Sequence, residues 1–175
     1  GAGSERVLFH NELPGFMKVP YNDLDAMVAA VDERTAAVIV EAIPATAGFP
    51  MPAPDYLAGL RAACDAAGAL LVVDEVQTGL GRTGTTWYVQ QEGVTPDALV
   101  TGKGLSGGVY PIAATLLTAD LHRFFGEHPF SQVSTYGGAD LGCVAAAEVC
   151  DIISEPGFLE RVQAVGAHLE ASFAD

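Results

Sequence analysis

Short apolar runs alternate with helix-like segments along most of this chain, and this alternation restricts its fold more than any other feature. The runs at 36–40, 69–73 and 98–101 are continuously hydrophobic, which is typical of strands buried on both faces. Between them, apolar side chains recur at helical spacing from Leu24 to Val31 and from Leu57 to Cys64. Alternating strands and helices build a mostly parallel sheet covered by helices, so we expect an α/β fold.

Cap and breaker residues predict where these elements begin and end. Asn22 is expected to cap the first helix, and Gly68 to end the second, which begins near Asp55. The stretch 44–54 is rich in proline and predicts a loop, and three glycines within 79–84 predict an extended, flexible one. A further strand is expected at 112–117.

The last third of the chain is predicted to be mainly helical. Residues 141–153 are apolar on nearly every side, which predicts a buried helix, and Pro156 and Gly157 should end it. A final amphipathic helix begins near Phe158 and its pattern is still running at the last residue, so we expect more protein to follow.

Composition excludes several classes of function. Half of the 175 residues are apolar and only 17% are charged, which suits one soluble domain with a sizeable core. A net charge of −14 with only eight lysines and arginines argues against binding nucleic acid or acidic membrane surfaces. No apolar stretch approaches the roughly 20 residues that span a bilayer, so a cytoplasmic protein is expected. The histidines and cysteines show no metal-ligand spacing, and no metal is expected.

Asp74 and Lys103 are the candidate catalytic residues. Asp74 ends the apolar run 69–73, and Lys103, one of only two lysines, follows the run 98–101 between two glycines. In open α/β sheets ligands gather at the carboxyl ends of strands, where both residues should lie. A buried carboxylate and a reactive amine suit pyridoxal 5′-phosphate, because the carboxylate can hold the proton of the pyridine nitrogen and the amine can bond the aldehyde. A loop carboxylate and a solvated lysine in a glycine turn are the simpler alternatives.

Two glycine-containing segments could contact phosphate. Residues 134–138, Ser-Thr-Tyr-Gly-Gly, supply hydroxyls and backbone amides before a helix, although an ordinary helix cap would look the same. Residues 79–84 match the dinucleotide pattern GxGxxG, but five residues separate them from the preceding strand and β-branched and aromatic residues follow. A nucleotide site there is therefore disfavoured.

In their order along the chain, these motifs resemble the class III aminotransferases of fold type I, the family that includes ornithine and 4-aminobutyrate aminotransferases. The matching segments are 19–24, 74–79, 81–84, 96–97, 102–105 and 135–138. The resemblance implies a three-layer α/β/α fold around a mostly parallel mixed sheet, as in the large domain of pyridoxal phosphate transferases, here incomplete. Residues 1–155 would be part of that cofactor-binding domain, and residues 156–175 would begin the connecting helix to a C-terminal small domain that is missing here.

The resemblance also implies roles for individual residues. Asp74 would bind the pyridine nitrogen of pyridoxal phosphate, and Lys103 would be the Schiff-base lysine. Val76 would pack on the ring face, and Gln77 would bond the ring hydroxyl. The implied reaction moves an amino group from an amine or amino acid to a 2-oxo acid, with Lys103 carrying the proton.

Ser134 and Thr135 are the expected phosphate ligands. In the family, the threonine binds the phosphate of the neighbouring subunit's cofactor, so the resemblance implies a homodimer in which Thr135 acts in trans. One departure concerns Thr46, which stands where the family usually has an acidic residue, and it leaves the amino donor and acceptor open. Arg82 has no assigned role beyond a loop salt bridge or subunit contact.

Two other functions compete with the aminotransferase. The chain could be a truncated or split, non-catalytic subunit that acts as a scaffold through apolar surface left exposed. The same cofactor could also support aminomutase or decarboxylase chemistry, because a fold and a cofactor do not fix the reaction.

Overall fold

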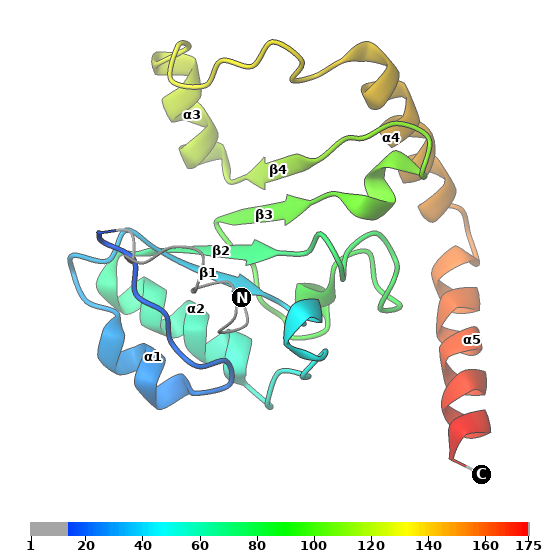
Figure 1. Cartoon of the computed structure of the whole chain (residues 1–175), viewed down its shortest axis with the longest axis horizontal. Coiled ribbons are helices and arrows are strands. Elements are labelled where there is room, and N and C mark those ends of the chain that lie inside the picture. The colour runs from blue at the N-terminus through cyan, green and yellow to red at the C-terminus, as the bar shows by residue number, and fades with distance from the viewer. Residues whose placement is uncertain (1–13, 175) are drawn as a thin grey trace.

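A four-stranded mixed sheet organises the computed structural model, which describes residues 14–174 (Figure 1). The strands β1 (Ala37–Glu41), β2 (Leu70–Asp74), β3 (Ala98–Thr101) and β4 (Ala114–Leu117) lie in the order β1-β2-β3-β4. The first three are parallel, and β4 pairs antiparallel with β3 at the edge. The predicted α/β class with a mostly parallel mixed sheet is confirmed.

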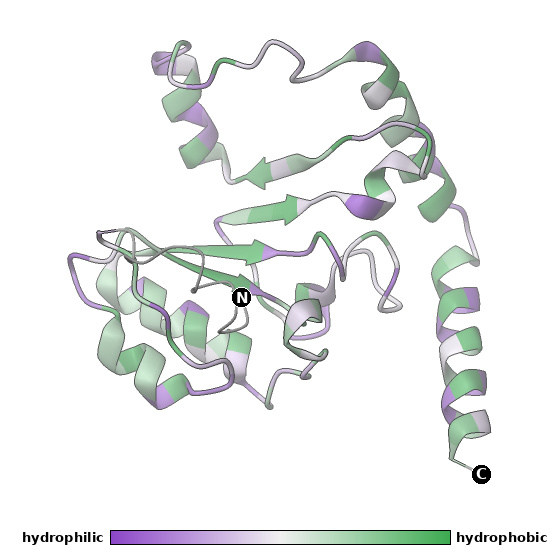
Figure 2. Ribbon diagram, viewed as in Figure 1, coloured by the Kyte–Doolittle hydropathy of each residue, from purple (hydrophilic) through white to green (hydrophobic). Residues whose placement is uncertain are grey.

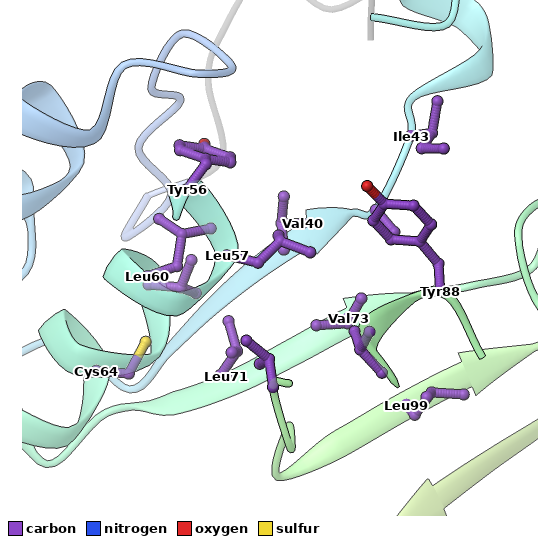
Figure 3. Close-up of a cluster of buried hydrophobic side chains, with 14 of the residues drawn as sticks. Val40, Ile43, Tyr56, Leu57, Leu60, Cys64, Leu71, Val73, Tyr88 and Leu99 are labelled. Atoms are coloured by element: carbon purple, nitrogen blue, oxygen red, sulfur yellow. The ribbon is translucent and has the colours of Figure 1, made fainter. Parts of the chain in front are cut away.

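Helix α2 (Tyr56–Ala67) lies against one face of the sheet, whose strands are largely apolar, and α1 (Leu24–Ala30) packs against α2 (Figures 1 and 2). The side chains of Leu57, Leu60 and Cys64 on α2 are fully buried, as their helical spacing predicted. They meet the alternate strand residues Leu71 and Val73, which are also fully buried (Figure 3). The alternation along β1 shows the two faces clearly: Val38 and Val40 are buried towards α2, whereas Ile39 between them is 67% exposed.

The predicted helix limits hold closely, with one correction. Gly68 ends α2 in a left-handed conformation (φ +73°) with its amide bonded to the carbonyls of Cys64 and Asp65. The cap of α1, however, is Asp23, whose Oδ1 accepts a hydrogen bond from Ala26 N, so the prediction for Asn22 is wrong. Asn22 instead binds the proline-rich loop, accepting from Ala53 N and donating to Met51 O. Hydrogen bonds between residues this far apart cannot be predicted from the local sequence.

The glycine-rich segment 79–84 is not the flexible loop that the sequence predicted. It belongs to a chain of turns in which Leu80 N donates to Thr86 O (2.7 Å). Helix α5 (Phe158–Phe173) packs against it, and Gln163 Nε2 donates to Gly84 O (2.7 Å). Gly81 and Gly84 have φ of +86° and +93°, and a Cβ on either would press on α5 side chains. The glycines therefore serve close packing against a helix, which is a physical reason for the motif that needs no nucleotide.

Beyond β3 the chain contains a 3₁₀ turn η4 (Lys103–Ser106), strand β4, and helices α3 (Ala119–Glu127), α4 (Asp140–Ile153) and α5. Helix α3 was not predicted. Helix α4 was predicted to be buried, but its Leu141 is 71% exposed and its Val144 68% exposed, so that prediction is wrong for this chain. The reason is that α4 contacts η4 and α5, which cover only part of its surface. Within residues 14–174, no helix is long and apolar enough to cross a membrane.

Candidate active site

The sheet register brings Asp74 and Lys103 to the same edge on neighbouring strands. Asp74 is the last residue of β2 and pairs with Val100 of β3, and Lys103 follows Val100 by three residues. Because β2 and β3 are parallel, Asp74 lies at the carboxyl end of its strand and Lys103 just beyond the carboxyl end of the neighbouring strand, at the same edge of the sheet, as predicted. The carboxylate is half-buried and the lysine is exposed.

Asp74 shapes the turn that follows it. Its Oδ1 accepts a hydrogen bond from Val76 N (2.8 Å), and the carbonyl of Glu75 accepts one from Gly79 N (2.9 Å). The turn carries Val76 and Gln77, both half-buried, directly after the strand. Within residues 14–174, Oδ2 of Asp74 receives no hydrogen bond from a side chain or turn amide, so this oxygen is available to a ligand.

Val76 packs against the backbone that precedes Lys103. A Cβ placed on Gly102 would lie 3.5 Å from Val76 Cγ1 and 3.5 Å from Ala113 Cβ. On the other side of the lysine, a Cβ on Gly104 would lie 3.4 Å from Leu80 Cδ1. Lys103 therefore stands between two glycines at which a Cβ would make ordinary van der Waals contacts, and Val76 lies beside the strand end that precedes the lysine.

The backbone at Lys103 is also unusual. Its φ is +36°, a region that side-chain-bearing residues seldom adopt and that costs about 1–3 kcal/mol. Such conformations persist where the surrounding packing enforces them, and they concentrate at functional sites. Four other side-chain-bearing residues of the described chain, Asn22, Phe49, Asp55 and Leu80, also have positive φ, so this observation agrees with the motif but does not by itself identify the lysine.

Ser134 and Thr135 lie in a separate part of the surface, between α3 and α4. Ser134 Oγ accepts a hydrogen bond from Gly137 N (2.9 Å), so it shapes its own turn, and both residues are exposed. Ser134 borders a hollow of about 250 Å³. Among the described residues, its lining comes from 110–113, Ser134, 136–139 and Gly142, and does not include Thr135. The structure therefore does not bring these two residues into the group formed by Asp74, Val76, Gln77 and Lys103, and their part in cofactor binding stays a prediction.

Two carboxylates to which the sequence assigned no role are prominent. Glu75 is fully buried beside Asp74, and Asp97 lies at the opposite end of the strands, where its Oδ2 accepts from Leu71 N (2.7 Å) and Arg61 Nη1 (2.6 Å). Burial would raise the pKa of the Asp97 carboxyl, but these bonds from Leu71 and Arg61 hold it below its ordinary value. The sequence does show that each carboxylate adjoins a buried strand. It does not show their roles, because the backbone amides and the arginine that bind them lie 13 to 36 residues away.

No group of three or more histidine, cysteine or acidic side chains in the described chain could hold a metal ion. The groups available for chemistry at this edge are the carboxylate of Asp74, the amine of Lys103 and the aliphatic side chain of Val76.

Comparisons with known proteins agree on one family. The sequence model of the family described as "Aminotransferase class-III" matches residues 4–175. An uncharacterized aminotransferase of Archaeoglobus fulgidus is 51% identical over 170 residues, which are 96% of this chain and 40% of that protein. The acetylornithine aminotransferase of Rhodobacter capsulatus is 44% identical over 164 residues, or 92% of this chain and 41% of that protein.

Solved structures extend the likeness to the fold. The ornithine aminotransferase from Toxoplasma gondii superposes with a TM-score of 0.85 at 37% identity, covering 91% of this chain and 37% of that one. That structure shows partial occupancy of PLP at the active site of the Toxoplasma gondii protein. The chain thus spans about two fifths of the length of the relatives that it matches.

Proposed function

This chain belongs to the class-III aminotransferase family, and we propose that it forms the cofactor-binding part of a pyridoxal phosphate-dependent aminotransferase. The observation that carries the proposal is the placement of Asp74 and Lys103 at the carboxyl ends of two adjacent parallel strands, with Val76 packed beside the strand end that precedes the lysine. The substrates would be an amine or amino acid as donor and a 2-oxo acid as acceptor.

The residues present fit the cofactor. Asp74 keeps Oδ2 available for a protonated ring nitrogen, and a partly buried carboxylate gains most from a cationic partner. Val76 offers an aliphatic surface to a ring face, and the exposed Lys103 amine can reach an aldehyde beyond the strand ends. When bound, pyridoxal phosphate supplies an electron sink for the charge released at the substrate Cα.

Each side chain then has a task of its own. Asp74 would keep a proton on the ring nitrogen, because an ionised carboxylate favours its cationic partner. Lys103 would hold the cofactor covalently at rest, and its amine, once released, would take and return the proton at the substrate Cα. Gln77, in the same turn as Val76, would orient the ring through its hydroxyl group.

The partner subunit and the domain limits belong to the proposal as well. Thr135, with Ser134 beside it, would bind the phosphate of the second subunit's cofactor in a homodimer, a role supported by the exposure of both side chains and by the hollow that Ser134 borders. Residues 1–155 would form part of the large domain, and residues 156–175 would begin the helix that leads to a small domain. Residues 1–13 and 175 of these segments lie outside the described part. The cytoplasmic location also stays a prediction.

The two lysines of the chain allow a sharp test of the proposal. Pyridoxal phosphate is added, the bond to the amine is reduced with borohydride, and the modified peptide is identified by mass spectrometry. We expect label on Lys103 and its loss in Lys103→Ala, whereas Lys18→Ala, at the other exposed lysine, should be labelled like the wild type. Equal labelling of both lysines would reject a specific site. A stable, cofactor-free complex with another protein would favour the scaffold.

A further inference from the structure

Glu75 is a fully buried carboxylate that the proposed reaction does not use. It directly follows Asp74, and its side chain lies on the opposite side of the strand end, in the protein interior. Among residues 14–174, none of the ion pairs includes it. Burying an unpaired charge is expensive, so a residue of this kind needs a structural or functional reason.

Three hydrogen bonds account for the carboxylate. Oε2 accepts from Thr78 Oγ1 (3.0 Å) and from Tyr88 N (2.7 Å), and Oε1 accepts from Val89 N (2.9 Å). Tyr88 and Val89 begin the 3₁₀ turn η3 (Tyr88–Gln90), so the carboxylate caps its free amides. The main chain of Glu75 is fixed too, since its amide donates to Val100 O of β3 (2.8 Å).

These bonds enclose the segment that faces the cofactor site. Val76 and Gln77 lie between Glu75 and Thr78, whose side chains are bonded to each other, and the carbonyl of Glu75 binds Gly79 N. The bonds to Tyr88 and Val89 attach this turn to the far end of the loop, 13 and 14 residues later. The position of Val76 and Gln77 relative to the sheet therefore depends on the buried Glu75 carboxylate, in addition to the bond from Val76 N to Asp74 Oδ1.

We propose that Glu75 is a positioning residue for cofactor binding, which holds Val76 and Gln77 in place without touching the cofactor. The inference rests on the proposed function, because it assumes that the turn 75–79 receives pyridoxal phosphate. It adds a residue that the expected set of ligands does not include.

The donors around Glu75 make the carboxyl group hard to replace. Burial raises the pKa of the Glu75 carboxyl, against the amides of Val89 and Tyr88 and the Thr78 hydroxyl, which lower it. A protonated carboxyl could still accept from both amides and donate to the Thr78 hydroxyl. A glutamine could not, because its NH₂ group would face one of the two amide N–H groups, donor against donor.

The test compares Glu75→Gln with Asp97→Asn in the full chain. Both variants replace a carboxylate that accepts a backbone N–H, but Asp97 lies at the other end of the same strands, away from the site. Three quantities are measured: pyridoxal phosphate affinity by spectroscopic titration, hydrogen exchange of the Tyr88 and Val89 amides without cofactor, and the thermal midpoint.

We expect Glu75→Gln to weaken cofactor affinity about tenfold, which is the size of effect expected from losing one charge-assisted hydrogen bond. We also expect the variant to speed hydrogen exchange at the amide of Tyr88 or Val89. Asp97→Asn should lower the thermal midpoint and leave the affinity unchanged. Thr78→Val keeps the carboxylate and its amide bonds, so it should weaken affinity in the same direction but only about threefold. This milder variant carries the test if Glu75→Gln does not fold.

Different failures have different meanings. If the wild type binds the cofactor at Lys103, and Glu75→Gln and Thr78→Val bind it equally well, only the inference about Glu75 is overturned. If the affinity falls just as far in Asp97→Asn, Glu75 contributes general stability and no positioning. If the wild type shows no specific labelling of Lys103, the proposed function fails and this inference fails with it.

Discussion

The two halves of this chain use similar apolar side chains in opposite ways. Among the described residues, the main buried apolar cluster lies between positions 38 and 99, in β1, α2, β2, β3 and the turns that join them, and Leu105 shortly after it is buried as well. From position 106 onward, large apolar side chains are mostly exposed, among them Val109, Phe130, Val133, Tyr136, Leu141, Val144 and Phe173. Much of α4 carries apolar colour in Figure 2, although α4 stands at the margin of the fold. An apolar composition thus predicts that burial would stabilise a segment, but the segment is buried only where another element packs against it.

The candidate site follows the same division. Asp74, Val76, Gln77 and Lys103 belong to the first half, where strand pairing and Glu75 hold the backbone in place. Ser134 and Thr135 belong to the second half, where both side chains are exposed. A site completed by a second subunit would need this pattern: one half built by the chain itself and one half presented outward.

Core deletion should give the largest effect, and only in the first half. Leu60→Ala removes a fully buried side chain and should lower the free energy of unfolding by about 2–5 kcal/mol. Leu141→Ala, on the exposed surface of α4, should change it by less than about 0.5 kcal/mol. Urea unfolding measures both. Equal losses would mean that the two halves are packed alike in solution.

A pair of glycines tests the contact between the loop 79–84 of the first half and α5 of the second half. Gly48 and Gly84 have nearly equal φ, +91° and +93°, but a Cβ on Gly48 meets nothing within 4 Å, whereas one on Gly84 lies 3.0 Å from Gln163 Cγ of α5. Gly48→Ala should cost about 1 kcal/mol from backbone strain alone, and Gly84→Ala about 2 kcal/mol.

The matching control for the glycine pair is Gln163→Ala, which removes the crowded side chain. Combined with Gly84→Ala, it should bring the cost of the glycine change back towards that of Gly48→Ala, as read from a double-mutant cycle of unfolding free energies. If the double variant lost the sum of the unfolding free energies lost by Gly84→Ala and Gln163→Ala, α5 would not pack against the loop.

The buried Glu75 and the half-buried Asp97 should affect stability with opposite dependence on pH. The folded pKa of Asp97 is lowered, so its contribution is present above the unfolded pKa and is lost as pH falls through the folded value. The folded pKa of Glu75 is raised, so its ionisation costs stability as pH rises from the ordinary value through the folded value. Asp97→Asn should therefore cost about 1 kcal/mol near neutral pH and less in acid.

Unfolding in urea at several pH values measures this difference. Compared with the wild type, Asp97→Asn should flatten the loss of stability on acidification, and Glu75→Gln should flatten the opposing trend. Curves parallel to the wild type would show that neither carboxyl group changes its pKa on folding.

Polar substitution on α4 should have the smallest effect on folding and a visible effect on assembly. Leu141→Ser with Val144→Ser exchanges exposed apolar side chains and should leave the free energy of unfolding of the single chain within about 0.5 kcal/mol. If the second half forms the subunit interface, the same variant should lower the dimer fraction in analytical ultracentrifugation. An unchanged dimer would place the interface elsewhere.

Much of the first half could be predicted because its signals are local. The run 98–101 coincides with β3, the runs 36–40 and 69–73 differ from β1 and β2 by one residue, and Gly68 ends α2 as expected. The errors concern long-range partners. Asn22 binds residues 29 and 31 positions away, and the loop 79–84 is held by a helix about 80 positions later.

The sequence by itself determined most of the elements, though not α3, together with the mostly parallel sheet and the strand ends that carry Asp74 and Lys103, because hydrophobic runs and glycines act within a few residues. Only the tertiary structure decided that Glu75 holds the turn of Val76 and Gln77, that the glycines receive α5, and that α4 lies exposed. These outcomes depend on hydrogen bonds and packing contacts between residues far apart in the sequence, and the packing of the whole chain decides which of these contacts form.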